Sequence, residues 1–184
     1  INENNDLNQS KKILNEMSNT LSHRGPDDFS DWIDFENQIF LAHRRLSILD
    51  LSINGRQPMI SHSGRYLIVF NGEIYNHLSL RKELNDLSYS PSWKSSSDTE
   101  TLLAGFDNWG IKKTIEKTEG MFAFAVWCRK SNTLTIGRDR LGEKPIYYGW
   151  QNNRGSNVFL FASELKAITK HPAFNNIIDR DSIS

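Results

Sequence analysis

The sequence predicts an α+β fold in which antiparallel sheets are stacked between helices. Residues 121–128 are apolar on both alternating faces, which is typical of a strand covered on both sides. Only a short polar turn separates this strand from the strand-like run 133–138, as in an antiparallel pair. Apolar residues also recur at helical spacing before and between the strands, at about 8–21 and 97–110. Paired strands with helices around them indicate a layered architecture.

The first third of the chain contains a helix, a hairpin and a strand. Helical spacing of apolar residues predicts the helix over 8–21, which ends before the loop signal Gly25-Pro26. Residues 32–35 and 39–42 flank a polar turn and resemble a hairpin. The apolar run 66–70 predicts a further strand.

Two helices and a shorter one follow in the middle of the chain. Leucines at helical spacing predict a helix that begins near Asn76, a good N-cap residue. Ser97 and Glu100 have capping-box spacing and predict the start of a second helix, for which Gly110 is the stop signal. A shorter helix is expected at about 111–118.

The last third adds a hairpin and a short helix. Residues 146–150 and 158–162 predict two strands joined by a polar loop. Ser163 is expected to cap a short helix that ends by Lys170.

Composition narrows the function classes. The chain has 184 residues, which suits one domain with a sizeable core, and its 22 basic and 22 acidic residues cancel. No long block of like charge indicates a nucleic-acid or membrane partner. A single cysteine excludes an internal disulfide framework. With no signal peptide and no stretch of membrane length, we expect a cytoplasmic location. The chain begins with Ile1 and stops inside what resembles a new element, so we expect a fragment cut at both ends.

Polar groups in three places of the sequence could together bind one small molecule. Asn71-Gly72 alone favours a tight turn, but here it follows a buried strand and precedes a helix, where its amide and N–H could hold an oxyanion. Arg45 and Asp98 each have an ordinary explanation, as a solvated guanidinium and a helix-start residue. A guanidinium fork for a carboxylate, Glu73 and Asp98 for an ammonium, and the Asn-Gly pair for a carbonyl oxygen would fit a free α-amino acid with an amide side chain.

Seven motifs then occur in an order that resembles a known family. They are Leu21 to Asp27, Ala42 to Asp50, Phe70 to Asn76, Ser97 to Glu100, Gly120 to Ala125, Gly137 to Pro145 and Ala162 to Ala167. Together they cover about 21–170, nearly the whole chain, and are similar to the glutaminase domain of glutamine-hydrolysing asparagine synthetase, a class II glutamine amidotransferase.

The resemblance implies a fold and a domain organisation. The fold is a four-layer αββα sandwich of two antiparallel sheets, of the N-terminal-nucleophile hydrolase type, here lacking its first strand. Residues 1–170 would form the glutaminase domain, truncated at its N-terminus. Residues 171–184 would begin the linker to an absent ATP-dependent synthetase domain. We expect glutamine as the ligand, the synthetase domain in cis, ATP and Mg²⁺ only in that domain, and the option of a homodimer.

The resemblance also implies site residues. The Asn71 side chain and the Gly72 N–H would form an oxyanion hole. Glutamine would be bound by Arg45 at its α-carboxylate, by Glu73 and Asp98 at its α-ammonium, and by a lining stretch of Leu46, Ser47, Ile48 and Leu49.

The nucleophile of this family is an N-terminal cysteine, which would lie upstream of Ile1. We therefore expect this chain to be inactive as a glutaminase. Cys128 is interpreted as a core thiol. The five histidines show no metal-ligand spacing, so we expect no metal, and His23 and His43 are interpreted as hydrogen-bonding residues. Motif residues without an assigned role are Arg138, Asp139, Lys144 and Glu164.

Other readings stay open. The domain could be vestigial, as in β-lactam-forming synthetases, although the retained glutamine-reading residues argue for a working glutaminase. Other class II amidotransferases make amino sugars or phosphoribosylamine and share part of the motifs. The parent could amidate aspartate, which is the default, or another carboxylate such as a sugar acid.

Overall fold

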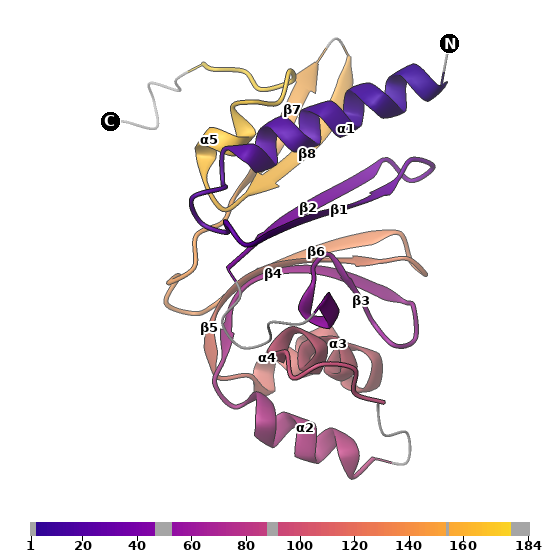
Figure 1. Cartoon of the computed structure of the whole chain (residues 1–184), viewed down its shortest axis with the longest axis vertical. Helices are drawn as coiled ribbons and strands as arrows, with labels where there is room; N and C mark the ends of the chain where they lie inside the picture. The colour runs from indigo at the N-terminus through magenta and orange to yellow at the C-terminus, as the bar shows by residue number, and fades with distance from the viewer. Residues whose placement is uncertain (1–2, 47–52, 88–91, 154, 178–184) are drawn as a thin grey trace. The chain divides into compact units, whose positions relative to one another are not determined.

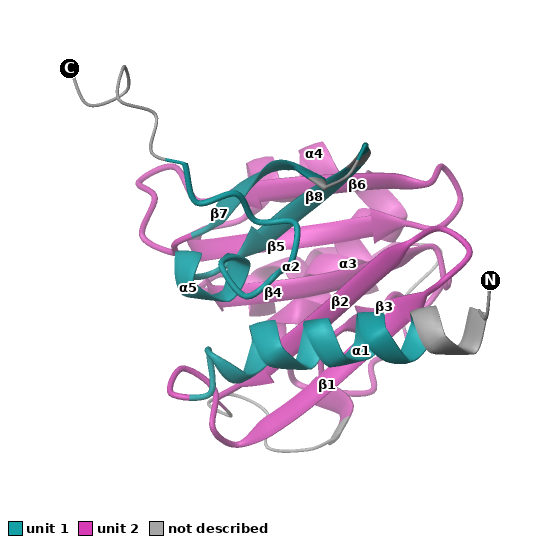
Figure 2. Cartoon of the chain, turned by 90° about the horizontal axis from the view of Figure 1, so that it is seen from above, with its two compact units in different colours: residues 1–22, 146–184 teal, residues 23–145 magenta. Residues whose placement is uncertain are grey.

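The computed structural model describes residues 3–46, 53–87, 92–153 and 155–177. These residues form two compact units (Figure 2). Unit 1 comprises residues 1–22 and 146–184, and unit 2 comprises residues 23–145.

Unit 2 is built on a four-stranded antiparallel sheet with the strand order β3-β4-β5-β6 (Figure 1). Its strands are β3 (Met59–Ile60), β4 (Tyr66–Ile74), β5 (Gly120–Cys128) and β6 (Thr133–Arg138). The two long central strands, β4 and β5, pair along their full length, from Tyr66 opposite Cys128 to Ile74 opposite Gly120.

Helices cover one face of this sheet and a hairpin lies over the other (Figure 1). The helices are α2 (His77–Asn85), α3 (Asp98–Trp109) and α4 (Ile111–Lys117). The hairpin consists of β1 (Asp28–Asp34) and β2 (Ile39–Arg45), and β2 is in contact with β4. A short 3-10 helix, Ile53–Gly55, precedes β3.

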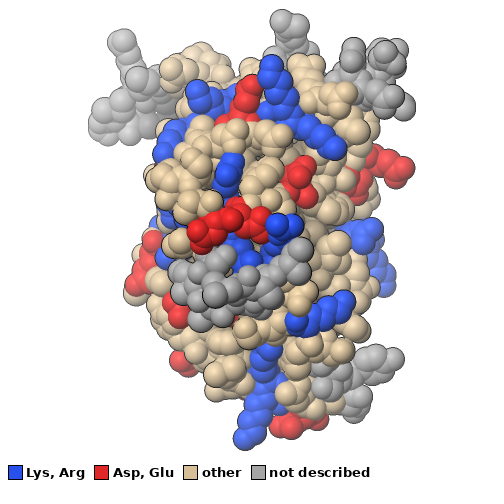
Figure 3. Space-filling model, in the orientation of Figure 1, with Lys and Arg blue, Asp and Glu red and all other residues tan. Residues whose placement is uncertain are grey.

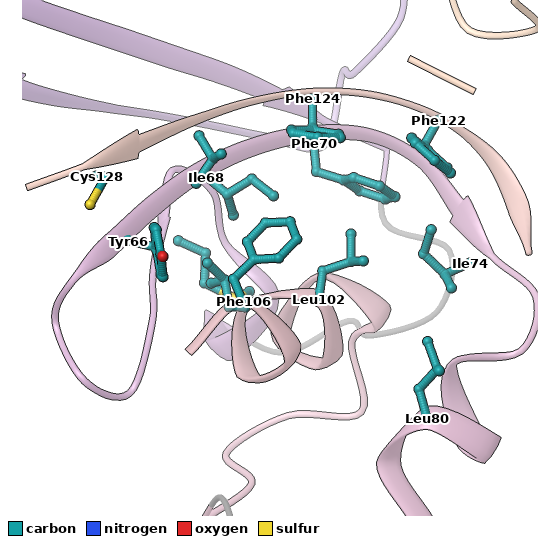
Figure 4. Close-up of a cluster of buried hydrophobic side chains, with 13 residues drawn as sticks. Tyr66, Ile68, Phe70, Ile74, Leu80, Leu102, Phe106, Phe122, Phe124 and Cys128 are labelled. Carbon is teal, nitrogen blue, oxygen red and sulfur yellow. The ribbon is translucent and has the colours of Figure 1, made fainter. Parts of the chain in front are cut away.

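The core of unit 2 lies between the sheet and α3, where β4 and β5 arch over the helix (Figure 4). Side chains alternate along a strand, so the even-numbered residues of β4 face α3 and join this core. Its members include Tyr66, Ile68, Phe70, Ile74, Leu102, Phe106, Phe122, Phe124, Val126 and Cys128. The odd-numbered residues, Asn71 and Glu73 among them, face the side of the hairpin.

Unit 1 contains α1 (Glu3–Asn19), the hairpin of β7 (Tyr147–Asn153) and β8 (Ser156–Ala162), and the short helix α5 (Leu165–Ile168). Helix α5 packs against both α1 and β8.

The predicted order of helices and strands is confirmed, but the predicted turn at Asn71-Gly72 is wrong. Strand β4 continues through both residues to Ile74, because β5 supplies a partner for each of them. The sequence also gave no signal for β3, which is only two residues long.

Two predicted caps are wrong in detail. Ser97 does cap α3, accepting a hydrogen bond from Thr99 N–H at 3.1 Å. Glu100 does not complete a capping box, because its carboxylate accepts instead from the N–H groups of Lys94 and Ser95 at 2.8 and 2.9 Å. The cap position of α5 is Glu164 rather than Ser163.

Charged side chains of both signs are interspersed over the visible face of the molecule (Figure 3). Within the described residues, every helix is too short or too polar to cross a membrane.

Candidate functional site

The candidate site is centred on the edge of β4 that faces away from β5. In an antiparallel ladder, pairs that exchange backbone hydrogen bonds alternate with pairs that exchange none. The N–H of Tyr75 donates to Glu119 O at 2.8 Å, in register with the β4–β5 pairs. Residues 71 and 73 therefore bond toward β5, and the N–H groups of residues 70, 72 and 74 point to the opposite edge.

Strand β3 covers this opposite edge only in part, because it pairs only with Leu67 and Ile68. Side chains take over where it ends. The N–H of Phe70 donates to Gln57 Oε1 at 2.6 Å, and the N–H of Ile74 donates to Asp98 Oδ2 at 2.9 Å. The edge is thus capped on both sides of Gly72.

Two hydrogen-bond donors of β4, one at this edge and one on the face toward the hairpin, have no acceptor within the described part of the chain. One is the N–H of Gly72, which lies between the capped N–H groups of Phe70 and Ile74. The other is Nδ2 of Asn71, which is buried and unpartnered. An unpaired buried donor costs free energy unless a ligand satisfies it. The two donors come from adjacent residues, as the two halves of an oxyanion hole would.

Glu73 and Asp98, which were predicted to act together, lie within electrostatic range of each other. Asp98, at the first turn of α3, is only 5% exposed, and burial raises the pKa of its carboxyl. The negative charge of Glu73 raises that pKa further, whereas His77 lowers it. A cation placed between the two acids would offset the electrostatic repulsion between their carboxylates.

Arg45 is the last residue of β2, paired with Asp28 in the hairpin. It lies two residues after His43 and therefore on the same face of β2, the face whose histidine contacts β4. Gly25 holds this strand end in place from the preceding loop. A Cβ at Gly25 would lie 2.4 Å from the carbonyl carbon of Arg44 and 2.5 Å from the Arg45 nitrogen, so only glycine permits the contact.

Not every predicted residue can be placed. Leu46 is exposed at 54% of its surface. Ser47, Ile48 and Leu49 lie outside the described residues.

His43, interpreted from the sequence as a hydrogen-bonding residue, forms such a bond next to the site. Its Nε2 lies 3.1 Å from the carbonyl oxygen of Phe70. Burial lowers the pKa of this histidine to about 4, so at neutral pH the ring is uncharged and Nε2 carries the proton that it donates. The Phe70 carbonyl belongs to the same peptide as the Asn71 N–H, so His43 fixes the peptide next to the Asn71 side chain.

Cys128 cannot serve these donors, as the prediction of a core thiol implied. It pairs with Tyr66, five residues along β4 from Asn71, which is about 17 Å at roughly 3.3 Å per residue. Its side chain belongs to the buried core on the α3 side, 5% exposed, whereas Asn71 faces the other side. A nucleophile must approach to about 3–3.5 Å.

The four motif residues without an assigned role have local partners. Asp139 accepts hydrogen bonds from the N–H groups of Phe122, Glu143 and Lys144 at 2.9–3.1 Å. The guanidinium of Arg138 donates to the Gly142 carbonyl. Glu164 forms an ion pair with Lys166 at 2.9 Å. Within the residues that the structure describes, no three metal-ligating side chains gather to form a cation site.

Comparison with known proteins agrees with this arrangement. The chain matches the family described as a glutamine amidotransferase domain over residues 2–184. It is 42% identical over 178 residues to asparagine synthetase [glutamine-hydrolyzing] 3 of Bacillus subtilis, covering 96% of this chain and 27% of the relative. It is 39% identical over 158 residues to asparagine synthetase B of Escherichia coli, covering 86% of this chain and 26% of the relative. The chain thus spans about a quarter of the length of these relatives.

A solved structure shares the fold. Glutamine phosphoribosylpyrophosphate amidotransferase of B. subtilis superposes on 70% of this chain, and on 28% of its own length, with a TM-score of 0.56 and 22% identity. This likeness confirms the predicted fold class, an α+β amidotransferase fold with antiparallel sheets. The chain belongs to the glutamine amidotransferase domain family.

Proposed function

We propose that this chain is the glutamine-binding domain of an asparagine synthetase-like ligase, which releases ammonia from the glutamine carboxamide. Family membership supports the reaction class. The observation that carries the proposal is the pair of adjacent unsatisfied donors, Asn71 Nδ2 and Gly72 N–H. No other feature of the described edge explains why one N–H is left open between two that side chains cap.

The remaining groups fit the rest of a glutamine molecule. The Arg45 guanidinium would hold the α-carboxylate as a bidentate fork. Glu73 and Asp98 would take the α-ammonium, whose charge offsets the repulsion between them. The stretch from Leu46 to Leu49 would line the side chain.

The chemistry requires a thiolate that attacks the carboxamide carbon, which turns the carbonyl oxygen into an oxyanion at the two donors. The proton that the thiol gave up on becoming the thiolate passes to the amide nitrogen, the C–N bond breaks and ammonia leaves. Water then hydrolyses the thioester to glutamate and restores the thiol. Cys128, the sole cysteine of the sequence, lies far from the donors. We therefore expect the 184-residue chain by itself to bind glutamine without releasing glutamate.

For the complete protein we propose a synthetase domain on the same chain that uses ATP and Mg²⁺ to amidate aspartate. Asparagine synthetases among the relatives favour this acceptor over a sugar acid. A cytoplasmic location and a homodimer belong to the same proposal.

The test is the Asn71→Ala variant of the complete gene product, with glutamate release as the readout. Loss of one oxyanion donor should lower kcat on the order of 10²- to 10³-fold while KM changes little, because the donor acts on the transition state. The matched control is Asn108→Ala, an exposed asparagine on α3 whose amide donates to Ala104 O within the same helix. Glutamate release within about twofold of the unmodified enzyme would contradict the proposal.

A further inference from the structure

A chain of hydrogen bonds connects the β4 edge of the candidate site to Asp98 and begins at Gln57, which is not among the predicted site residues. The β3–β4 register places Gln57 opposite Phe70, where the next backbone partner of β4 would stand. Its side-chain amide takes the place of that backbone. Gln57 is only 8% exposed, and both ends of its amide are occupied.

The orientation of this amide is fixed by its partners. The N–H of Phe70 can only donate, so the atom 2.6 Å from it must be the oxygen, Oε1. Nε2 is then left to donate to Thr99 Oγ1 at 3.3 Å. The backbone carbonyl of Gln57 accepts from the Ser30 hydroxyl of β1, which fixes the residue from its other side.

Thr99 continues the chain of hydrogen bonds to Asp98. It is 2% exposed, and its hydroxyl accepts from Gln57 and faces Asp98 Oδ1 at 3.5 Å. The other carboxylate oxygen of Asp98 accepts from the Ile74 N–H at 2.9 Å. The path therefore leaves β4 at Phe70 and returns to it at Ile74, and the residues that it encloses are Asn71, Gly72 and Glu73.

This path, which we call the Gln57–Thr99 bridge, joins the two halves of the candidate site. Asp98 would hold one end of the substrate, and the edge of β4 would hold the other. A shift of about 1 Å in such a geometry can cost on the order of a hundredfold in rate.

We propose that Gln57 and Thr99 are positioning residues that hold the oxyanion donors of β4 at a fixed distance from Asp98. Neither residue touches substrate in this proposal, which rests on the proposed glutaminase function. Because the bridge sets geometry rather than binding, its loss should affect kcat more than KM.

The experiment uses the complete gene product with three variants. Thr99→Val removes the hydroxyl and keeps the shape, Thr99→Ser keeps the hydroxyl, and Gln57→Ala removes the amide. We expect kcat for glutamate release to fall about 10- to 100-fold in Thr99→Val and Gln57→Ala, and Thr99→Ser to stay within about threefold of the unmodified enzyme. The double variant Gln57→Ala with Thr99→Val should be no slower than the slower single variant, because both cut the same path.

Two further measurements separate positioning from a folding defect. Synthesis driven by added ammonia bypasses glutamine hydrolysis and should stay within about twofold in every variant. Thr114→Val is the matched control, because Thr114 is also fully buried and its hydroxyl donates locally, to Gly110 O at the start of its own helix. It should leave both activities unchanged.

The outcomes distinguish the two proposals. An unmodified enzyme that releases no glutamate from glutamine would overturn the proposed function and this inference with it. An active enzyme whose Thr99→Val variant keeps its kcat, or loses ammonia-driven synthesis in the same proportion, would overturn the bridge alone.

Discussion

Gly72 shows how one residue without a side chain makes the candidate site. Its position in β4 brings the backbone so close to β5 that a Cβ would lie 2.2 Å from Met121 O and 2.6 Å from the Phe122 Cα. Both contacts are with backbone, which cannot move aside as a flexible side chain could. The same residue leaves its N–H open at the other edge. Only the close packing requires glycine here, because any residue except proline would carry the same N–H.

We predict that Gly72→Ala destabilises the domain by about 1–3 kcal/mol, because the added methyl group must push β4 and β5 apart. Urea unfolding of the 184-residue chain measures this change. Gly149→Ala is the control, since a Cβ at that β7 position meets nothing within 4 Å. It should change the free energy of unfolding by less than about 0.5 kcal/mol. An equal effect of the two substitutions would show that the β4–β5 contact is looser than the structure indicates.

At the scale of elements, the segment that follows β6 is held to β5 by one residue, Asp139, through its backbone and its carboxylate. The β5–β6 pairing ends at Ala123 and Arg138. Asp139 then takes over, accepting from the Phe122 N–H at 3.1 Å and donating its own N–H to the Phe122 carbonyl at 2.8 Å. Burial acts to raise the pKa of Asp139, but the N–H groups that it accepts from lower it to about 2. The residue that it clamps, Phe122, lies directly opposite Gly72.

Asp139→Ala should lower the free energy of unfolding by about 2–3 kcal/mol, because it leaves the buried Phe122 N–H without an acceptor. Asp139→Asn keeps one acceptor oxygen, so its free energy of unfolding should lie between that of Asp139→Ala and that of the unmodified chain. Chemical unfolding monitored by tryptophan fluorescence gives the values, with the exposed Asp86→Ala as control. If Asp139→Ala proves as stable as the control, the hydrogen bonds that the Asp139 carboxylate accepts contribute nothing to stability.

The elements also show what the sequence could and could not reveal. The pattern of apolar residues located the long helices and strands, because most of them bury one face against the core and β5 buries both. It failed at Asn71-Gly72, where a turn signal lies inside a strand: the nine-residue partner β5, distant in sequence, overrides the local preference. Gln57 gave no signal either, and Thr99 stood inside the motif Ser97 to Glu100 without an assigned role. Their roles depend on where β3 ends beside β4, which is set by register between segments and not by local pattern.

At the scale of the whole molecule, the predicted site residues that the structure describes all fall within unit 2. Asn71, Gly72 and Glu73 come from its central strand, Asp98 from the helix packed on that strand, and Arg45 from the hairpin on the opposite face. The family motifs supplied these positions from the sequence. The structure explains their spacing, because the sheet, the helix and the hairpin each hold one group of residues. His43 and the Gln57–Thr99 bridge hold these groups relative to one another.

The stability of the whole fold should depend on pH through His43. Burial lowers the pKa of this histidine from 6.5 to about 4, and the nearby positive charge of Arg45 acts in the same direction. Between these two pKa values the unfolded chain binds a proton that the folded chain does not, so the free energy of unfolding rises with pH there and falls on acidification. The loss of free energy of unfolding on acidification begins below pH 7 and reaches up to about 3 kcal/mol near pH 4.

Urea unfolding at a series of pH values, compared between the unmodified chain and His43→Gln, isolates this effect. Glutamine can still donate to the Phe70 carbonyl but does not titrate, so the variant should lose stability less steeply between pH 6.5 and 4. Burial lowers the pKa of His77 and His171 as well, but both remain in the variant and cancel in the comparison. His62→Gln, an exposed histidine, should keep the original slope. An unchanged slope in His43→Gln would mean that the ring is solvated in the folded state, and the support that His43 gives to the Asn71 peptide would then have to come from another group.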